Sequence, residues 1–360
     1  MYSLLSKMLS PTQRSTLKVF LALCAPLLLV LLFWSRREHG AVAADAPTPT
    51  SGAAPAARPQ PRLEHVASAP ASLTPDNGHV LTELTWGSGP SQFGRPTEEE
   101  GQDTGVNMTV DSKGDIVLLD RVNGRILRVA ADGKFAGAMP LPNGGAVDVA
   151  VAKDGTLAVL GGEQPQRVTL LGVDGNVLGS LRAESENGPF RGVTVAGRDV
   201  FAESHSGELV RLGDIQGADD GRHTLPEGRP MRDGHGFLSA VISDAEAGTL
   251  HVYVLEGEPL HQRFSRQAQL NLTVEGLFLV DTDAAGVIYI GLTGMAPSTR
   301  TPRLARLVCF EPQRGNVVGT VDLPIKPEET IVDAAVPDSG GMSYAVWTRN
   351  GLRLVHAECR

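Results

Sequence analysis

The chain has 360 residues, of which 41% are hydrophobic and 20% charged, and its formal net charge is −9. Its first 78 residues carry seven basic and four acidic side chains, so residues 79–360 carry a net charge of −12. A nucleic-acid-binding protein needs a basic face to neutralise phosphates, so this balance argues against a DNA or RNA partner.

Near the N-terminus, sixteen apolar residues lie between Lys18 and Ser35, with three basic side chains before them and Arg36-Arg37 after them. This pattern is typical of a membrane anchor or of a signal peptide. As a helix the run spans roughly 24 Å, short of a hydrocarbon core of ~30 Å unless its flanks contribute. The arginine pair separates the run from the small-residue site Ala41–Ala43, which favours retention over cleavage. Residues 1–40 are therefore predicted to form an N-terminal apolar helix that anchors the chain. The alternative is a cleaved signal peptide and a secreted protein.

Residues 41–78 are rich in alanine, proline, serine and threonine. A segment of this composition cannot bury a hydrophobic core and stays extended and solvated. We expect a disordered linker that holds the following domain, residues 79–360, away from a membrane.

The stretch from Gly105 to Pro142 contains four short apolar segments, and turns rich in Asp-Gly and Asn-Gly separate them. Such segments are typical of antiparallel strands joined by tight hairpins. Four of them in a meander make one blade of a β-propeller.

The first hairpin turn of this stretch recurs along the chain. The glycines that mark it are Gly114, Gly155, Gly197, Gly248, Gly286 and Gly341, with gaps of 41, 42, 51, 38 and 55 residues. A period of about 40–50 residues with strands on both sides of each turn indicates a propeller. The predicted fold class is all-β, a six-bladed β-propeller with four-stranded antiparallel blades.

The last repeat supplies only three strands, at residues 331–336, 342–347 and 352–357. One isolated strand, His79–Trp86, precedes the first repeat. If it pairs with the last strand of the chain, it completes the sixth blade and removes the open edges of the ring. We therefore expect closure by this strand.

The first repeat resembles the NHL-repeat family of β-propellers. The residues that carry the resemblance are Gln92, Phe93, Pro96, Gly114, Asp120, Asn123, Arg125 and Ile126. The second repeat matches in part, with Gly162 where the family has an aspartate, and later repeats keep only strands and turns. The resemblance implies a structural role for Asp120, Asn123 and Arg125, with Asp120 and Arg125 paired to hold neighbouring loops. Similar six-bladed folds serve as protein scaffolds, RNA binders, and calcium-dependent lactonases and lyases.

Two cysteines lie in the predicted propeller. Cys309 falls in the third strand of the fifth repeat, and Cys359 follows the third strand of the sixth. Adjacent blades bring equivalent strands near each other, so one hypothesis is that Cys309 and Cys359 form a disulfide outside the cytoplasm. Packed sheets lie about 10 Å apart, however, and a disulfide requires Cα atoms within about 7 Å. That comparison favours free cysteines.

Connections between repeats, and between the second and third strands of a repeat, share one face in the family's topology. The longest polar ones are Arg95–Gly105, Arg182–Arg191, Pro226–Gly236 and Gly294–Pro302. Loops carry binding more often than the strands that position them. The predicted binding surface consists of Arg191, Glu203, His205, Arg232, Asp233 and His235.

No spacing in the chain specifies a metal site, and no nucleophile or phosphate-loop motif occurs in it. We therefore predict a membrane-tethered scaffold with its propeller in the periplasm or outside the cell. Its partner is a protein or a peptide, no cofactor is expected, and a binding role is favoured over catalysis. One alternative is a calcium-dependent propeller hydrolase or lactonase with its site in the central channel, and another is a purely structural part of an envelope complex.

Overall fold

The computed structural model describes residues 78–96, 106–141, 145–185, 188–205, 207–218, 228–295, 304–326 and 328–359, and the backbone of 64–65 and 223–224. All elements within these ranges are β-strands. The predicted anchor helix at residues 1–40 lies outside the described residues, as does nearly all of the linker. Within the described ranges, no helix is long and apolar enough to cross a membrane.

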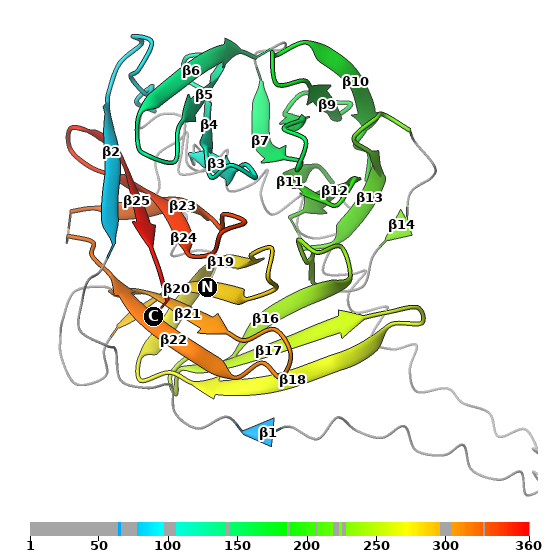
Figure 1. Cartoon of the computed structure of the whole chain (residues 1–360), viewed down its shortest axis with the longest axis vertical. Coiled ribbons are helices and arrows are strands. Elements are labelled where there is room, and N and C mark those ends of the chain that lie inside the picture. Colours follow the sequence, from blue (N-terminus) through cyan, green and yellow to red (C-terminus); the bar gives the residue numbers. More distant parts are fainter. Residues whose placement is uncertain are drawn as a thin grey trace, which may run out of the picture. The chain divides into compact units, whose positions relative to one another are not determined.

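Six antiparallel sheets are arranged as blades around a central axis, in chain order (Figure 1). Blade one is β3 (Asn107–Val110), β4 (Ile116–Asp120), β5 (Arg125–Val129) and β6 (Phe135–Pro140). Blade two is β7 (Ala146–Val151), β8 (Leu157–Gly161), β9 (Arg167–Leu171) and β10 (Val177–Arg182). Blade three is β11 (Phe190–Ala196), β12 (Asp199–Ser204), β13 (Leu209–Asp214) and β14 (His223–Thr224).

Blade four is β15 (Arg229–Pro230), β16 (Gly236–Asp244), β17 (Thr249–Glu256) and β18 (His261–Gln269). Its outer edge also pairs in parallel with β1 (Glu64–His65). Blade five is β19 (Thr273–Thr282), β20 (Ile288–Met295), β21 (Leu304–Phe310) and β22 (Val317–Leu323). Blade six is β23 (Thr330–Ala335), β24 (Met342–Trp347), β25 (Gly351–Ala357) and the early strand β2 (His79–Thr85). The predicted six-bladed, all-β architecture is confirmed.

Burial falls toward the outer edge of the first blade. In blade one the second strand, β4, is buried at all five positions, whereas the outermost strand, β6, is exposed or half-buried throughout. A strand that is covered on both faces has a nearly continuous apolar sequence, and β4 has such a sequence, with four apolar residues in a row. Apolar clusters between neighbouring blades thus form the core.

The hairpins repeat one piece of turn chemistry. In blade one the Gly114 N–H donates to the Asp111 carbonyl, and Gly114 has a φ of +86°, which favours glycine. The Asp111 carboxylate accepts the N–H groups of Lys113 and Asp115. Asp283 does the same for Ala285 and Val287 in blade five. The turn residues therefore satisfy their own backbone groups, as short polar side chains in turns commonly do.

The ring is closed by pairing between the two ends of the domain. Strand β2 runs antiparallel to β25, from His79 opposite His356 to Thr85 opposite Gly351. The prediction that the early strand completes the sixth blade is confirmed. An apolar cluster that contains Leu84 then packs blade six against blade one.

In the fourth repeat, the prediction of which turn joins the first and second strands was wrong. Its first turn lies at Met231–His235, where the Gly234 N–H donates to the Met231 carbonyl as Gly155 does to Ala152. Gly248, taken as that turn from the sequence, lies instead between the second and third strands, β16 and β17. The first strand of this blade, β15, has only two residues, so no apolar run preceded the true turn. The other five marker glycines lie where predicted.

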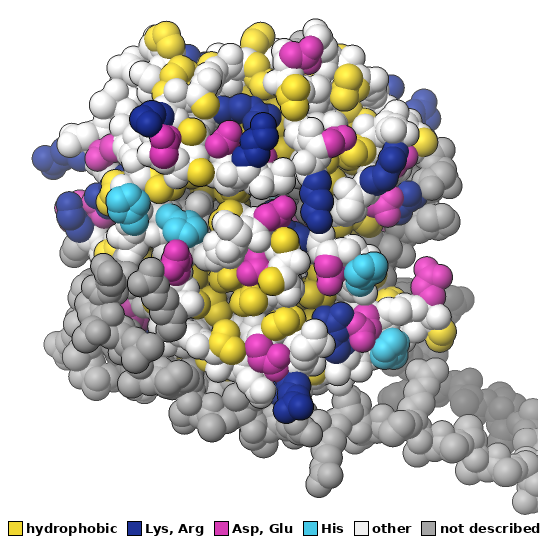
Figure 2. All heavy atoms as spheres, viewed as in Figure 1, with side chains coloured by type: hydrophobic (Ala, Val, Ile, Leu, Met, Phe, Trp, Pro, Cys, Tyr) yellow, Lys and Arg dark blue, Asp and Glu magenta, His cyan; other side chains and the backbone are white. Residues whose placement is uncertain are grey.

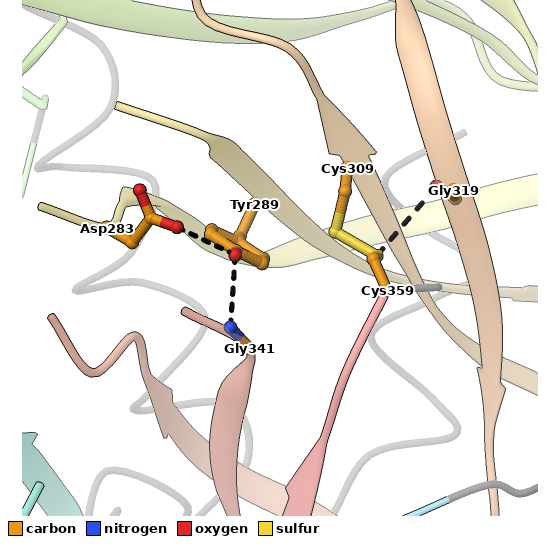
Figure 3. The surroundings of a disulfide bond; sticks show 6 residues. All are labelled: Asp283, Tyr289, Cys309, Gly319, Gly341 and Cys359. Carbon is orange, nitrogen blue, oxygen red and sulfur yellow. Dashed lines mark hydrogen bonds between the residues drawn. A yellow bond between two sulfur atoms is a disulfide. The ribbon is translucent and has the colours of Figure 1, made fainter. Parts of the chain in front are cut away.

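Figure 3 shows two of the links between blades five and six. Cys309 and Cys359 form a disulfide with Cα atoms 6.3 Å apart, so the expectation of free cysteines was wrong. That expectation applied the spacing of packed sheets, but Cys359 lies beyond the end of β25, where the chain approaches β21 and β22. The second link is the Tyr289 hydroxyl, which donates to the Asp283 carboxylate and accepts the Gly341 N–H.

Candidate functional site

Asp120, Asn123 and Arg125 connect blade one to the loop that precedes it. The Arg125 Nε donates to the Asp120 carboxylate at 2.9 Å, and its second terminal nitrogen donates to the Gln92 carbonyl at 2.6 Å. The Asn123 amide donates to the same carboxylate at 2.8 Å and to the Gly87 carbonyl at 3.0 Å. Asp120 is fully buried, so this ion pair holds the loop and leaves no free group for a ligand.

The propeller has two ends, which its antiparallel blades define. Turns between first and second strands, such as Gly114 and Gly234, lie at one end, here called the hairpin end. Connections between blades, and between second and third strands, lie at the other, here called the connection end. Arg191 is the second residue of β11, Glu203 is next to the last residue of β12, and His205 follows that strand, so these three lie at the connection end.

The structure does not bring Arg232, Asp233 and His235 to that surface. They belong to the first turn of blade four, at the hairpin end, because that turn is marked by Gly234 and not by Gly248. The prediction that the polar connections all meet on one face therefore fails for this turn. Most of the expected loops at 95–105 and 294–302 lies outside the described residues.

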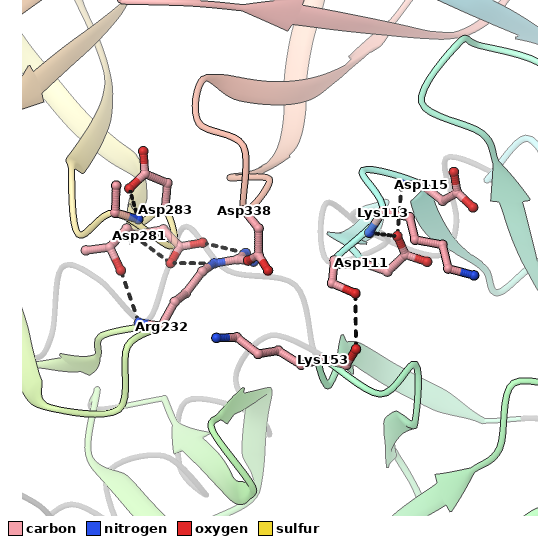
Figure 4. A network of polar contacts seen from close by, with 11 residues as sticks. Asp111, Lys113, Asp115, Lys153, Arg232, Asp281, Asp283 and Asp338 are labelled. Carbon is pink, nitrogen blue, oxygen red and sulfur yellow. Dashed lines mark hydrogen bonds and ion pairs between the residues drawn. The ribbon is translucent and has the colours of Figure 1, made fainter.

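Arg232 joins three blades at the hairpin end (Figure 4). Its guanidinium pairs with Asp281 at 3.1 Å and with Asp338 at 3.3 Å, and its backbone N–H donates to the Thr282 hydroxyl. Burial alone would lower the pKa of Arg232, but Asp281 and Asp338 keep it above its ordinary value. With two carboxylates on one guanidinium, Arg232 fastens blade four to blades five and six.

A cavity of about 520 Å³ opens among blades three, four and five at the connection end. Its walls include Gly207, Leu209, Gly228 and stretches 238–241 and 277–280. Three residues of its rim are Arg191, Glu203 and Arg229. The first strand of blade four is only two residues long, which leaves part of β16 to line the cavity.

Glu203 bridges the two arginines of this rim. One of its oxygens lies 2.5 Å from Arg191 and the other 3.0 Å from Arg229. The arginine side chains are 49% and 52% exposed, and that of Glu203 is 15% exposed. Burial pushes the pKa of Glu203 upward, but Arg229 and Arg191 together hold it below its ordinary value. Arg191 and Glu203 were both predicted from the sequence, and the structure places them in contact. His205 lies exposed two residues beyond Glu203.

Two partly buried carboxylates on the innermost strands did not stand out in the sequence. Asp148 on β7 accepts the N–H of Val193 on β11, and Asp333 on β23 accepts the N–H of Met108 on β3. Each thus satisfies a backbone donor on the first strand of the next blade. Burial raises the pKa of Asp148 to about 6 and that of Asp333 to about 7. The available signal was a single Asp inside an otherwise apolar strand.

Metal-ligating clusters and serine–histidine contacts are the two arrangements to consider in the described ranges. No three or more His, Cys, Asp or Glu residues there converge as a metal site. Two serine–histidine contacts occur, His251 with Ser265 at 2.6 Å and His356 with Ser343 at 3.3 Å. Both serines are buried at 4% exposure and serve as cross-strand contacts. The calcium-dependent alternative stays a prediction.

Charge is distributed evenly over the face shown in Figure 2. Acidic and basic side chains alternate there with hydrophobic ones, and no continuous basic patch covers the described residues of that face. Such a surface lacks the extended positive charge that phosphate backbones require.

No family model matches the chain, and no curated protein matches it. Solved structures that are similar include the β-propeller domain of Cps50 (Swd1) from Myceliophteria thermophila, with 11% identity and a TM-score of 0.44 over 78% of this chain and 99% of that one. A streptogramin B lyase has 10% identity and a TM-score of 0.43 over 78% and 98%. U3-55K has 10% identity and a TM-score of 0.45 over the same shares. The NHL-repeat resemblance is thus not matched by a family model, and the architecture rests on the strand pairing above.

Proposed function

We propose that the protein is a membrane-tethered scaffold outside the cytoplasm that captures a protein or peptide partner at the connection end of its propeller. The observation that carries this proposal is the cavity beside Arg191, Glu203 and Arg229. Arginine and apolar pockets are enriched where protein interfaces gain most of their binding energy. A polar rim around an apolar centre is the general arrangement of such interfaces.

The proposed location draws on two features. The Cys309–Cys359 disulfide favours an oxidising compartment, because thiols in the cytosol are kept reduced. The apolar run before Ser35 would supply the tether, and full-length protein should then sediment with membranes and resist extraction by salt. A mature protein that begins near Ala44 would instead support the cleaved and secreted alternative.

Charge reversal on the full-length protein tests the binding role. Arg191→Glu places a second carboxylate beside Glu203, so we expect at least about a tenfold loss of partner recovered by affinity purification. Because the Arg191 side chain is about half exposed, the thermal midpoint should change little. Lys113→Glu, in an exposed turn at the hairpin end, is the matched control. Equal recovery with both variants would remove the case for this surface.

A further inference from the structure

The cavity combines an apolar wall with two guanidinium groups. Val241, Phe278 and Val280 contribute to the wall and keep part of their surface exposed. Arg191 and Arg229 are on the rim, and each side chain is about half exposed. Its volume of about 520 Å³ falls within the range of ligand pockets, roughly 300–1,000 Å³. A ligand that matches both parts has an apolar body and a negatively charged end.

Glu203 shows what kind of anion the arginine pair accepts. Its carboxylate gives one oxygen to Arg191 and the other to Arg229. Each guanidinium has five N–H donors, so the pair retains donors for a second carboxylate after Glu203 is bound. The three side chains together carry a formal charge of +1, and Asp148 and Asp333 lie close enough to Arg229 to interact with its charge. Each of these two aspartates already accepts a backbone N–H group.

We propose that this cavity binds an apolar group that carries a carboxylate, either as a free small molecule or as the C-terminus of a peptide. The inference rests on the proposed function, whose partner it describes in chemical terms. The carboxylate contacts Arg191 and Arg229, where it competes with Glu203. The apolar body lies against Val241, Phe278 and Val280. Glu203 then occupies part of the site that the ligand carboxylate would use, and this competition weakens ligand binding.

Calorimetric titration of the full-length chain in zwitterionic nanodiscs tests this, with empty nanodiscs as the blank. The probes are octanoate and octanamide, and acetyl-Gly-Ala-Leu with a free or an amidated C-terminus. At least one carboxylate should bind about tenfold more tightly than its amide, because a charge-assisted hydrogen bond is lost in the amide. Binding by octanoate alone or by the peptide alone identifies the source of the ligand. Equal binding of acid and amide, or no binding above the blank, overturns the proposal.

Substitutions on both sides of the ion pair make the test specific. Glu203→Gln should tighten carboxylate binding about tenfold, because it removes the competing charge, and a purely structural residue would not produce a gain. Arg229→Gln should weaken carboxylate binding about tenfold and leave amide binding unchanged. Ser239→Trp, which fills the cavity, should weaken acid and amide alike. Lys113→Gln is the control and should match the wild type. Weaker binding by Glu203→Gln with an unchanged thermal midpoint would contradict the account.

The two proposals fail separately. If Arg191→Glu abolishes partner capture but no carboxylate binds, the surface is correct and the ligand chemistry is wrong. If carboxylates bind as described but Arg191→Glu leaves partner capture intact, the cavity is a ligand site and the partner uses another surface.

Discussion

At the scale of single residues, the charged side chains of this propeller divide by where they are held. Arg232 and the aspartates of the innermost strands are tied to other blades, whereas Arg191 and Arg229 share one glutamate and stay half exposed. A charge with fixed partners on several sides stabilises the fold, and one with free donors at a cavity is available for binding. The binding surface predicted from the sequence contained one residue of each kind, Arg232 and Arg191, because polarity and loop position do not reveal which side chains a residue contacts.

The pKa of Asp148 predicts a specific pH dependence of stability. Burial raises this pKa from 3.8 to about 6, so the folded protein holds the proton more tightly than the unfolded chain does. The resulting stabilisation is full below pH 3.8 and is lost as pH rises through about 6. Relative to Asp148→Asn, wild-type protein should lose about 2 kcal/mol of unfolding free energy between pH 4 and pH 8. Urea unfolding at intervals of pH measures this.

Ser112→Ala, in an exposed turn, is a control for that measurement, because it removes no titratable group and should differ from wild type by a constant amount across the same pH range. A pH-independent difference between wild type and Asp148→Asn would show that Asp148 is not held in the proposed environment.

Arg232→Glu should destabilise the protein rather than impair binding alone. The change places a third carboxylate beside Asp281 and Asp338 at a half-buried site. Loss of a buried ion pair costs about 3–5 kcal/mol, and like charges add to that cost. Thermal unfolding should show the loss, with Lys113→Glu as the neutral comparison. An unchanged midpoint for Arg232→Glu would mean that the link between blades four, five and six contributes little.

At the scale of elements, strands with strong apolar runs were predictable and short ones were not. Strand β4 and its neighbours follow from their sequence, and so does the pairing of β2 with β25. Strand β15 was missed because two residues, Arg229-Pro230, carry no periodicity. That omission shifted the phase of blade four and moved Arg232 to the wrong end. The cavity was also beyond prediction, since it arises where β15 is too short to cover β16.

Deletion of the closing strand tests the role of β2. A variant that begins at Gly87 leaves the edge of β25 unpaired and removes Leu84 from the core between blades six and one. We expect a thermal midpoint at least about 10 °C below that of a chain that begins at Pro75, because several kcal/mol of packing is lost. Differential scanning calorimetry measures the shift. Equal midpoints would show that the ring does not depend on this strand.

At the scale of the whole molecule, the ring is held shut by links of different kinds. Strand pairing joins the two ends of the domain, the disulfide ties the C-terminal segment to blade five, and Arg232 fastens the hairpin end. A closed ring presents its connection end as one rigid surface, which reduces the ordering cost when a partner binds. The fold could thus be predicted from repeats, whereas the shape of the binding surface required the positions of all blades together.

Site-specific photo-crosslinking tests whether partners bind at the connection end. A photoreactive residue is placed in the full-length protein either at Val241, an exposed residue that lines the cavity, or at Lys113 at the hairpin end. We predict a covalent adduct with the partner from position 241, its loss when Arg191→Glu is added, and none from position 113. Adducts from position 113 but not from 241, or equal adducts from both, would contradict binding at the connection end.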